Sequence, residues 1–118
     1  MKKIIFYSYL KCSTCKKAEK WLKSKDFEFQ LIDIVKEPPI IKYLNLALKQ
    51  YSDDKKKIFN TRGKAFKSID VDIQSLSREE IIQLLLSNGK LIKRPFLVYE
   101  EKKVILGFNE IEYAKQFL

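Results

Sequence analysis

The fold of this chain follows from residues 4–22, which read IIFYSYLKCSTCKKAEKWL. The run from Ile4 to Tyr7 is short, apolar and rich in strand-forming residues, so it predicts a buried strand. A helix is expected next, because the apolar residues that follow recur at helical spacing: Cys15, Ala18, Trp21 and Leu22. Cys12 and Cys15 therefore stand where a strand gives way to the start of a helix.

A second strand is expected over residues 27–32, where Phe27, Phe29 and Leu31 alternate with polar residues. A strand, a helix and a strand of this combined length normally make two parallel strands joined by a right-handed crossover. Helices are predicted next. One opens at Pro38-Pro39, and further short helices are expected near 54–60 and 63–68. Another helix is expected to begin with a capping box at Ser77–Glu80 and to stop at Asn88–Gly89.

The last third of the chain returns to strands. Phe96–Tyr99 and Val104–Leu106 are apolar runs joined by a charged turn, and Asn109 is placed to cap a final helix. This order of elements predicts an α/β fold with a thioredoxin-like (glutaredoxin-like) core and a mixed sheet. We expect one domain of 118 residues, with its core at about 1–36 and 90–118 and a helical insertion at about 37–89.

The composition is that of a folded, basic protein. Apolar residues make up 46% of the chain, and 24 Lys and Arg against 15 Asp and Glu give a formal charge of +9. Such a charge can attract nucleic acid, but the lysines are spread through every predicted helix, and the longest run is short. Solubility is therefore the favoured explanation of the charge, and no direct contact with nucleic acid is expected.

The N-terminal apolar stretch ends by Ser8 and Lys11, which is too short for a secretory signal, and no apolar run is long enough to span a bilayer. We therefore expect a cytoplasmic protein without membrane contact. Structural disulfides are rare in that compartment, so two cysteines separated by two residues indicate redox or metal chemistry.

The Cys-x-x-Cys motif lies at a predicted helix start, and that position has chemical consequences. Free backbone N–H groups and the helix dipole favour a thiolate there, and Lys11 and Lys16 add positive charge. We expect Cys12 to be the nucleophile, since thiol–disulfide exchange proceeds through the thiolate. Cys15, about one turn further on, would resolve a mixed disulfide by attacking Cys12.

Two other interpretations of the cysteines stand beside this one. A Cys-x-x-Cys can form half of a zinc site, although this sequence has no His and no third Cys. A complete site would then need two chains or carboxylate ligands. The cysteines could also be inert core residues.

Arg94-Pro95 is the second chemical feature of the sequence. An X-Pro bond just before a strand can be cis, and the cis-proline loop of thioredoxin folds faces the Cys-x-x-Cys. Arg94 would then lie beside Cys12 and could bind an anionic substrate through its fork of donors. In the alternative interpretation, Arg94 is a surface residue and Pro95 begins an edge strand.

Taken jointly, four motifs resemble the arsenate reductase (ArsC)/Spx family, and in particular its Spx-like arsenate reductase family proteins. The resemblance covers essentially the whole chain and rests on Cys12-Ser-Thr-Cys15, Asn60-Thr-Arg62-Gly, Lys93-Arg94-Pro95-Phe96 and Leu106-Gly-Phe-Asn-Glu110. It implies a thioredoxin-like fold with an inserted helical region.

The resemblance also implies roles for individual residues. In arsenate reductases a cysteine matching Cys12 attacks the oxyanion, and arginines matching Arg62 and Arg94 bind that oxyanion, with the latter preceding a cis-proline that corresponds to Pro95. The third arginine falls at or near Gly107, which carries no charge, so Lys11 is expected to help form the anion pocket. No bound cofactor is implied. An external thiol reductant, such as glutathione with glutaredoxin, or thioredoxin, would restore the enzyme.

Two functions follow from the resemblance. The first is a monomeric thiol–disulfide oxidoreductase that acts on a small anionic or disulfide substrate. The second is a redox-sensing transcriptional regulator, because Spx carries a Cys-x-x-Cys switch and binds the C-terminal domain of the α chain of RNA polymerase. Spx has a glycine important for that contact at the position of Asp54, which favours the first function here.

Overall fold

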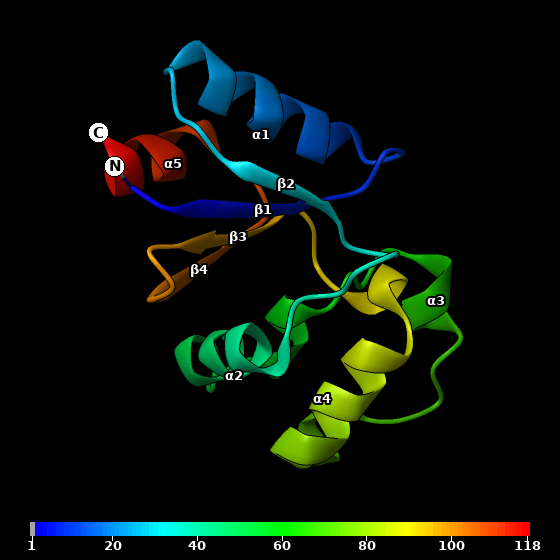
Figure 1. Ribbon diagram of the computed structural model, residues 1–118. Coiled ribbons are helices and arrows are strands. Elements are labelled where there is room, and N and C mark those ends of the chain that lie inside the picture. The colour runs from blue at the N-terminus through cyan, green and yellow to red at the C-terminus, as the bar shows by residue number, and fades with distance from the viewer. Residues whose placement is uncertain (1) are drawn as a thin grey trace.

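The computed structural model describes residues 2–118, and it places a four-stranded sheet between two groups of helices (Figure 1). The elements in chain order are β1 (Ile4–Ser8), α1 (Ser13–Ser24), β2 (Gln30–Asp33), α2 (Ile41–Gln50), η1 (Lys55–Ile58), α3 (Lys64–Lys67), η2 (Ile73–Ser75), α4 (Arg78–Ser87), η3 (Gly89–Leu91), β3 (Phe96–Tyr99), β4 (Lys103–Leu106) and α5 (Glu110–Phe117). The α1 and α5 helices cover one face, and α2 and α4 lie on the other side of the sheet.

The sheet has the strand order β2-β1-β3-β4 and is mixed, as the sequence predicts. The β1 strand runs parallel to β2 and antiparallel to β3, and β3 and β4 form an antiparallel hairpin. The predicted α/β class and the crossover from β1 through α1 to β2 are therefore confirmed.

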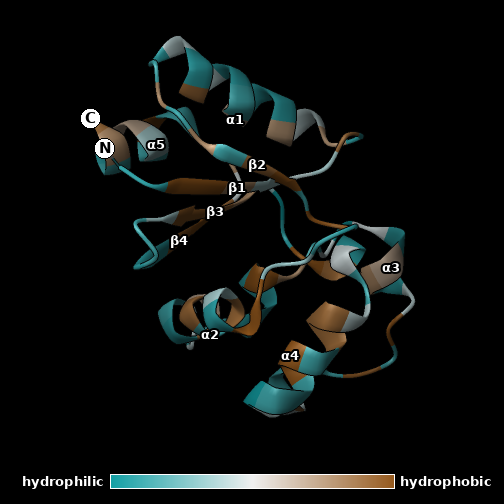
Figure 2. Cartoon of the chain, viewed as in Figure 1, coloured by the Kyte–Doolittle hydropathy of each residue, from teal (hydrophilic) through white to brown (hydrophobic). Residues whose placement is uncertain are grey.

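Alternation along β1 divides the core into two clusters. Ile4 and Phe6 pack with residues of α1 and α5, whereas Ile5 and Tyr7 pack with residues of α2 and α4. Successive side chains of a strand point to opposite faces, so one short strand contributes to both clusters. Figure 2 shows the hydrophobic part of β1 lying between the two helical layers.

The second strand begins later than the sequence indicates. The β2 strand starts at Gln30, so Phe27 and Phe29 precede it. Phe27 stacks on Trp21 with ring centroids 6.2 Å apart, and Phe29 meets Phe6 edge to face at 5.5 Å. The alternation of Phe27 and Phe29 therefore reflects aromatic packing on α1 and β1 rather than strand pairing.

The helix predicted at Pro38-Pro39 also begins later. Ile40 is the N-cap of α2 and Ile41 is its first residue, so both prolines precede the helix. The capping box predicted at Ser77 and Glu80 is present at the start of α4.

The end of α4 lies at Ser87, as Asn88–Gly89 predicts, but the reason for the glycine differs from the expected one. A Cβ on Gly89 would lie 2.2 Å from the carbonyl oxygen of Ile34 and 2.8 Å from the Cα of Val35. Gly89 is therefore required by the close approach of the chain after β2, rather than by a left-handed helix end.

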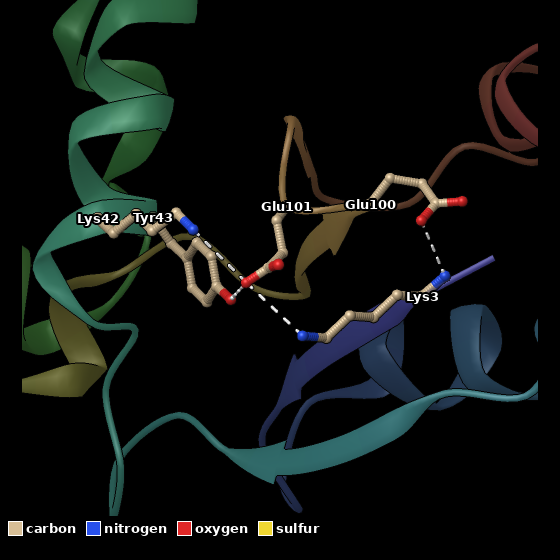
Figure 3. Close-up of polar contacts among 5 residues, drawn as sticks. All are labelled: Lys3, Lys42, Tyr43, Glu100 and Glu101. Carbon is tan, nitrogen blue, oxygen red and sulfur yellow. Dashed lines mark hydrogen bonds and ion pairs between the residues drawn. The ribbon is translucent and has the colours of Figure 1, made fainter.

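The hairpin between β3 and β4 is fastened to α2 by one carboxylate (Figure 3). Tyr43 Oη donates to Glu101 Oε1 at 2.9 Å, and the Nζ atoms of Lys3 and Lys42 each lie 3.6 Å from the same oxygen. The hydrogen bond from Tyr43 and the two lysines hold the pKa of Glu101 below its usual value.

The turn of this hairpin carries an unusual backbone conformation. Glu100 and Glu101 have φ values of 53° and 55°, a left-handed conformation that non-glycine residues adopt at an energetic cost.

Candidate functional site

Cys12 is the N-cap residue of α1, and its thiol lies at the end of that helix. Its φ and ψ are −100° and 109°, and the backbone N–H of Cys15 donates to Cys12 Sγ at 3.2 Å. The loop before it is closed by a hydrogen bond from Cys12 N to Tyr9 O at 3.0 Å. Both cysteines are free thiols, and Cys12 is partly exposed. The predicted position of Cys12 at the helix start is therefore the observed one.

Cys15 is fully buried in the first turn of α1, behind Cys12. Burial raises the pKa of the Cys15 thiol to about 12, and the hydrogen bond to Cys12 acts in the same direction. Hydrogen bonds from the backbone of Tyr9 and the side chain of Ser8 act in the opposite direction. The two thiols thus differ in access, since Cys12 is open to solvent and Cys15 faces the protein interior.

Ser8 is a site residue that the sequence reasoning missed. Among residues 2–118 it is the one polar residue that is buried, and it ends β1 directly before the loop that carries Cys12. Its side chain lies near the Cys15 thiol, where it acts to lower the pKa of that thiol against the effect of burial. The signal available in the sequence was a serine closing an otherwise apolar strand four residues before a cysteine.

Arg94 lies beside the loop that carries Cys12. Its guanidinium carbon is 4.9 Å from the centroid of the Tyr9 ring, and its Nη1 donates to Lys90 O at 3.3 Å. The Arg94–Pro95 peptide bond is cis, and Pro95 is buried. Because Tyr7 pairs with Phe96 in antiparallel register, Pro95 lies at the same end of the sheet as the end of β1.

The alternative interpretation of Pro95 is wrong. Pro95 precedes β3, which pairs with β1 on one side and β4 on the other, so β3 is an interior strand. The carbonyl of Pro95 accepts a hydrogen bond from Gly107 N at 2.9 Å.

The other two basic residues predicted for the site are exposed. Lys11 lies in the loop before Cys12, and Arg62 lies in the turn that precedes α3. Among residues 2–118, no carboxylate lies within ion-pair distance of either side chain or of Arg94. Arg94 is thus held by contacts with Tyr9 and Lys90, whereas Lys11 and Arg62 have no such ordering contact in the described part of the chain.

A pocket of about 320 Å³ adjoins the cysteine loop on the β2 side. It is lined by Ser8, Tyr9, Leu10, Lys16, Glu19, Leu31, Ile32 and Asp33. Leu10 is 80% exposed and Leu31 is 54% exposed, so the rim presents apolar surface next to charged groups. The site therefore combines an accessible thiol, a buried thiol, unpaired cations and a neighbouring hollow.

Within residues 2–118, the His, Cys, Asp and Glu side chains form no group of three or more that could hold a metal ion. None of the helices in that range has the length and apolar character needed to cross a membrane.

Known proteins resemble this chain over almost its whole length. Regulatory protein MgsR of Bacillus subtilis (strain 168) is 33% identical over 112 residues, which cover 95% of this chain and 88% of MgsR. Global transcriptional regulator Spx of Lactiplantibacillus plantarum is 33% identical over 112 residues, covering 95% of this chain and 84% of Spx.

The same relationship appears among solved structures. The crystal structure of a possible arsenate reductase from Streptococcus mutans UA159 matches with a TM-score of 0.87 at 35% identity, covering 97% of this chain and 98% of that one. The predicted thioredoxin-like fold is thereby confirmed. The ArsC family model matches residues 7–116, and the chain therefore belongs to the ArsC family.

Proposed function

We propose that this protein is a thiol–disulfide oxidoreductase of the arsenate reductase/Spx type, with Cys12 as nucleophile and Cys15 as resolving cysteine. The observation that carries the proposal is the hydrogen bond of 3.2 Å from Cys15 N to Cys12 Sγ at the start of α1. An N–H group aimed at this sulfur stabilises a thiolate, which is the reactive form.

In the first step, the Cys12 thiolate attacks one sulfur of a disulfide substrate. A bond forms between Cys12 Sγ and that sulfur, the substrate disulfide breaks, and the second substrate sulfur leaves as a thiolate that takes up a proton. Cys12 is suited to this step because it is the accessible thiol of the pair.

In the second step, Cys15 loses its proton and attacks Cys12 Sγ. The bond between Cys12 Sγ and the first substrate sulfur breaks, that sulfur leaves as a thiolate that takes up a proton from solvent in place of the one Cys15 lost, and a disulfide joins Cys12 to Cys15. The substrate has then gained two electrons. A thioredoxin- or glutaredoxin-type reductant, or glutathione, returns two electrons to the pair and restores the dithiol.

The substrate-binding residues of this proposal are Arg94, Arg62, Lys11 and Pro95. Arg94 lies against Tyr9 beside the cysteine loop and lacks a carboxylate partner among residues 2–118, so its donors can bind an anionic substrate group. Lys11 and Arg62 add exposed positive charge, and Pro95 joins Arg94 to β3 through a cis peptide bond. We place this chemistry in the cytoplasm, in a monomer that contacts neither membrane nor nucleic acid.

Two cysteine variants test the mechanism. With a small glutathione-containing disulfide as substrate, Cys12→Ser should form no covalent adduct and lose reductase activity. Cys15→Ser should accumulate a mixed disulfide at Cys12, heavier by one glutathionyl group in the intact mass. Full reductase activity in Cys12→Ser would refute the mechanism, and so would an adduct at Cys15 in that variant.

A second candidate function is redox-sensing regulation of transcription, in which the Cys12–Cys15 disulfide changes a surface that binds the α chain of RNA polymerase. Its support is the similarity to MgsR and Spx, which are both named as regulators. The C-terminal domain of that polymerase α chain should then bind one redox state in a pull-down. Absence of binding in both redox states would remove this candidate.

A further inference from the structure

A second basic hollow lies apart from the cysteines, between the turn after α2 and the segment before β3. Its volume is about 390 Å³, and its lining consists of Asp54, Lys56, Lys57, Phe59, Thr61 and Lys93. Cys12, Arg62 and Arg94 are absent from this lining. The hollow therefore has a different lining from the residues proposed for thiol chemistry, although Thr61 and Lys93 adjoin Arg62 and Arg94 in the chain.

Backbone pairing brings the lysines of this hollow together. Residues 58–60 run antiparallel to residues 91–93, with Lys93 N donating to Ile58 O at 2.8 Å and Asn60 N donating to Leu91 O at 2.8 Å. Lys56 and Lys57 lie in η1, immediately before this pairing. Two segments more than 30 residues apart in the chain are thus fixed side by side, with their lysines around one hollow.

Gly107 leaves room for the side chain of Lys93. The Cε atom of Lys93 lies 3.4 Å from the position that a Cβ on Gly107 would occupy. Gly107 has a φ of 71°, a conformation that also favours glycine. The apolar stem of Lys93 therefore packs on the backbone at Gly107, which restricts the place of its ammonium group.

The ammonium groups of this hollow are unpaired. Lys3, Lys23 and Lys42 each lie 3.6 Å from a carboxylate oxygen, whereas no ion pair within residues 2–118 involves Lys56, Lys57 or Lys93. Asp54 is the acidic residue of the lining, so three lysines and one aspartate contribute to this hollow. A hollow with this balance attracts a ligand that carries more than one negative charge.

From this arrangement we infer that the hollow binds a phosphoryl group that carries more than one negative charge, for which diphosphate is a simple probe. Lysines bind phosphate as point charges that can approach a tetrahedral anion from several directions, and the hydroxyl of Thr61 adds a donor. The inference goes beyond the proposed redox function, because no cysteine takes part in it.

Pyrophosphate is the probe, titrated into the reduced protein at constant ionic strength and followed by amide chemical shifts. The largest shifts are expected at Thr61 and Lys93. Lys93→Gln should weaken binding about tenfold, since hydrogen bonds to charged groups contribute at least that much. Asp54→Asn should tighten binding about threefold, because it removes a carboxylate that repels the anion.

Lys90→Gln is the matched control, because Lys90 is an exposed lysine three residues from Lys93 and does not line the hollow. Its affinity for pyrophosphate should equal that of the wild type. Equal weakening by Lys90→Gln and Lys93→Gln would show general charge attraction and overturn the inference.

Two further measurements complete the test. If Arg94→Gln abolished binding while Lys93→Gln kept it, the anion would occupy the arginine site and the inference would be wrong. Succinate should bind more weakly than pyrophosphate at the same ionic strength, and equal affinity would overturn the assignment to phosphoryl groups. The reactivity of Cys12, measured in the same variants, reports separately on the redox proposal.

Discussion

The charged side chains near the two ends of β1 differ in whether a group of opposite charge pairs with them. At the β1 start, Glu101 accepts from Tyr43 and lies within 3.6 Å of Lys3 and Lys42, so the charges there are paired (Figure 3). At the β1 end, where the cysteine loop begins, Arg94 contacts an aromatic ring and a carbonyl.

Among residues 2–118, no carboxylate pairs with Lys11 or Arg94 at the cysteine end, nor with Arg62 in the turn before α3. Paired charges fasten one part of a fold to another, whereas unpaired cations beside a thiol remain available to a substrate anion. Under the proposed function, the hairpin end is structural and the cysteine end is functional.

The backbone that supports the cysteine end should be the more sensitive to substitution. In Gly89→Ala, the new methyl group would meet the Ile34 carbonyl at 2.2 Å, and Ile34 N donates to Ser8 O at the end of β1. We expect a loss of about 3 kcal/mol in the free energy of unfolding, measured by urea denaturation. An unchanged midpoint would contradict the close approach on which this prediction depends.

A smaller effect is expected when the hydroxyl of Ser8, which lies near Cys15, is removed. Since the pKa of Cys15 is raised to about 12, its thiolate fraction should grow about tenfold per pH unit below that value, and the resolving step should accelerate with it. Ser8→Ala removes a hydrogen bond that favours the thiolate, so the resolving step should slow about tenfold at fixed pH. Release of an aryl thiolate from a mixed disulfide at Cys12 measures the rate.

Ser13→Ala is the control for this experiment, because Ser13 is exposed in the same turn of α1. Its rate and pH profile should match the wild type. If Ser8→Ala and wild type had the same rates across the pH range, Ser8 would have no part in resolution.

The smallest effect is expected at the hairpin end. Glu100 adopts a φ of 53°, which asparagine tolerates better than glutamate. Glu100→Asn should therefore raise the free energy of unfolding by about 0.5 kcal/mol, although it loses the contact of 3.3 Å from Lys3 N to Glu100 Oε2. Reductase activity should stay unchanged, and a fall in activity would refute the division of β1 into a structural and a functional end.

Local patterns in the sequence predicted much of the fold and the centre of the site. The apolar run at residues 4–7 and the helical spacing after Cys15 gave the strand, the helix and the cysteines at their junction. The capping box at Ser77 and Glu80 was equally visible, because caps depend on residues only three positions apart. These features are short in range, so their signals survive in a sequence read alone.

Contacts between distant segments could be found only in the tertiary structure. Phe27 packs on Trp21, although its alternation with Phe29 in the sequence is also typical of a strand. The role of Gly89 depends on its close approach to Ile34, which lies 55 positions away. The placement of Arg94 on Tyr9 and of Lys93 over Gly107 likewise arises from how β1, β3 and β4 come together. The sequence by itself determined the order of helices and strands and the position of the two cysteines at a helix start, through local periodicity and capping. The tertiary structure decided which charges are paired and which thiol is buried, because both depend on packing between segments remote in the chain.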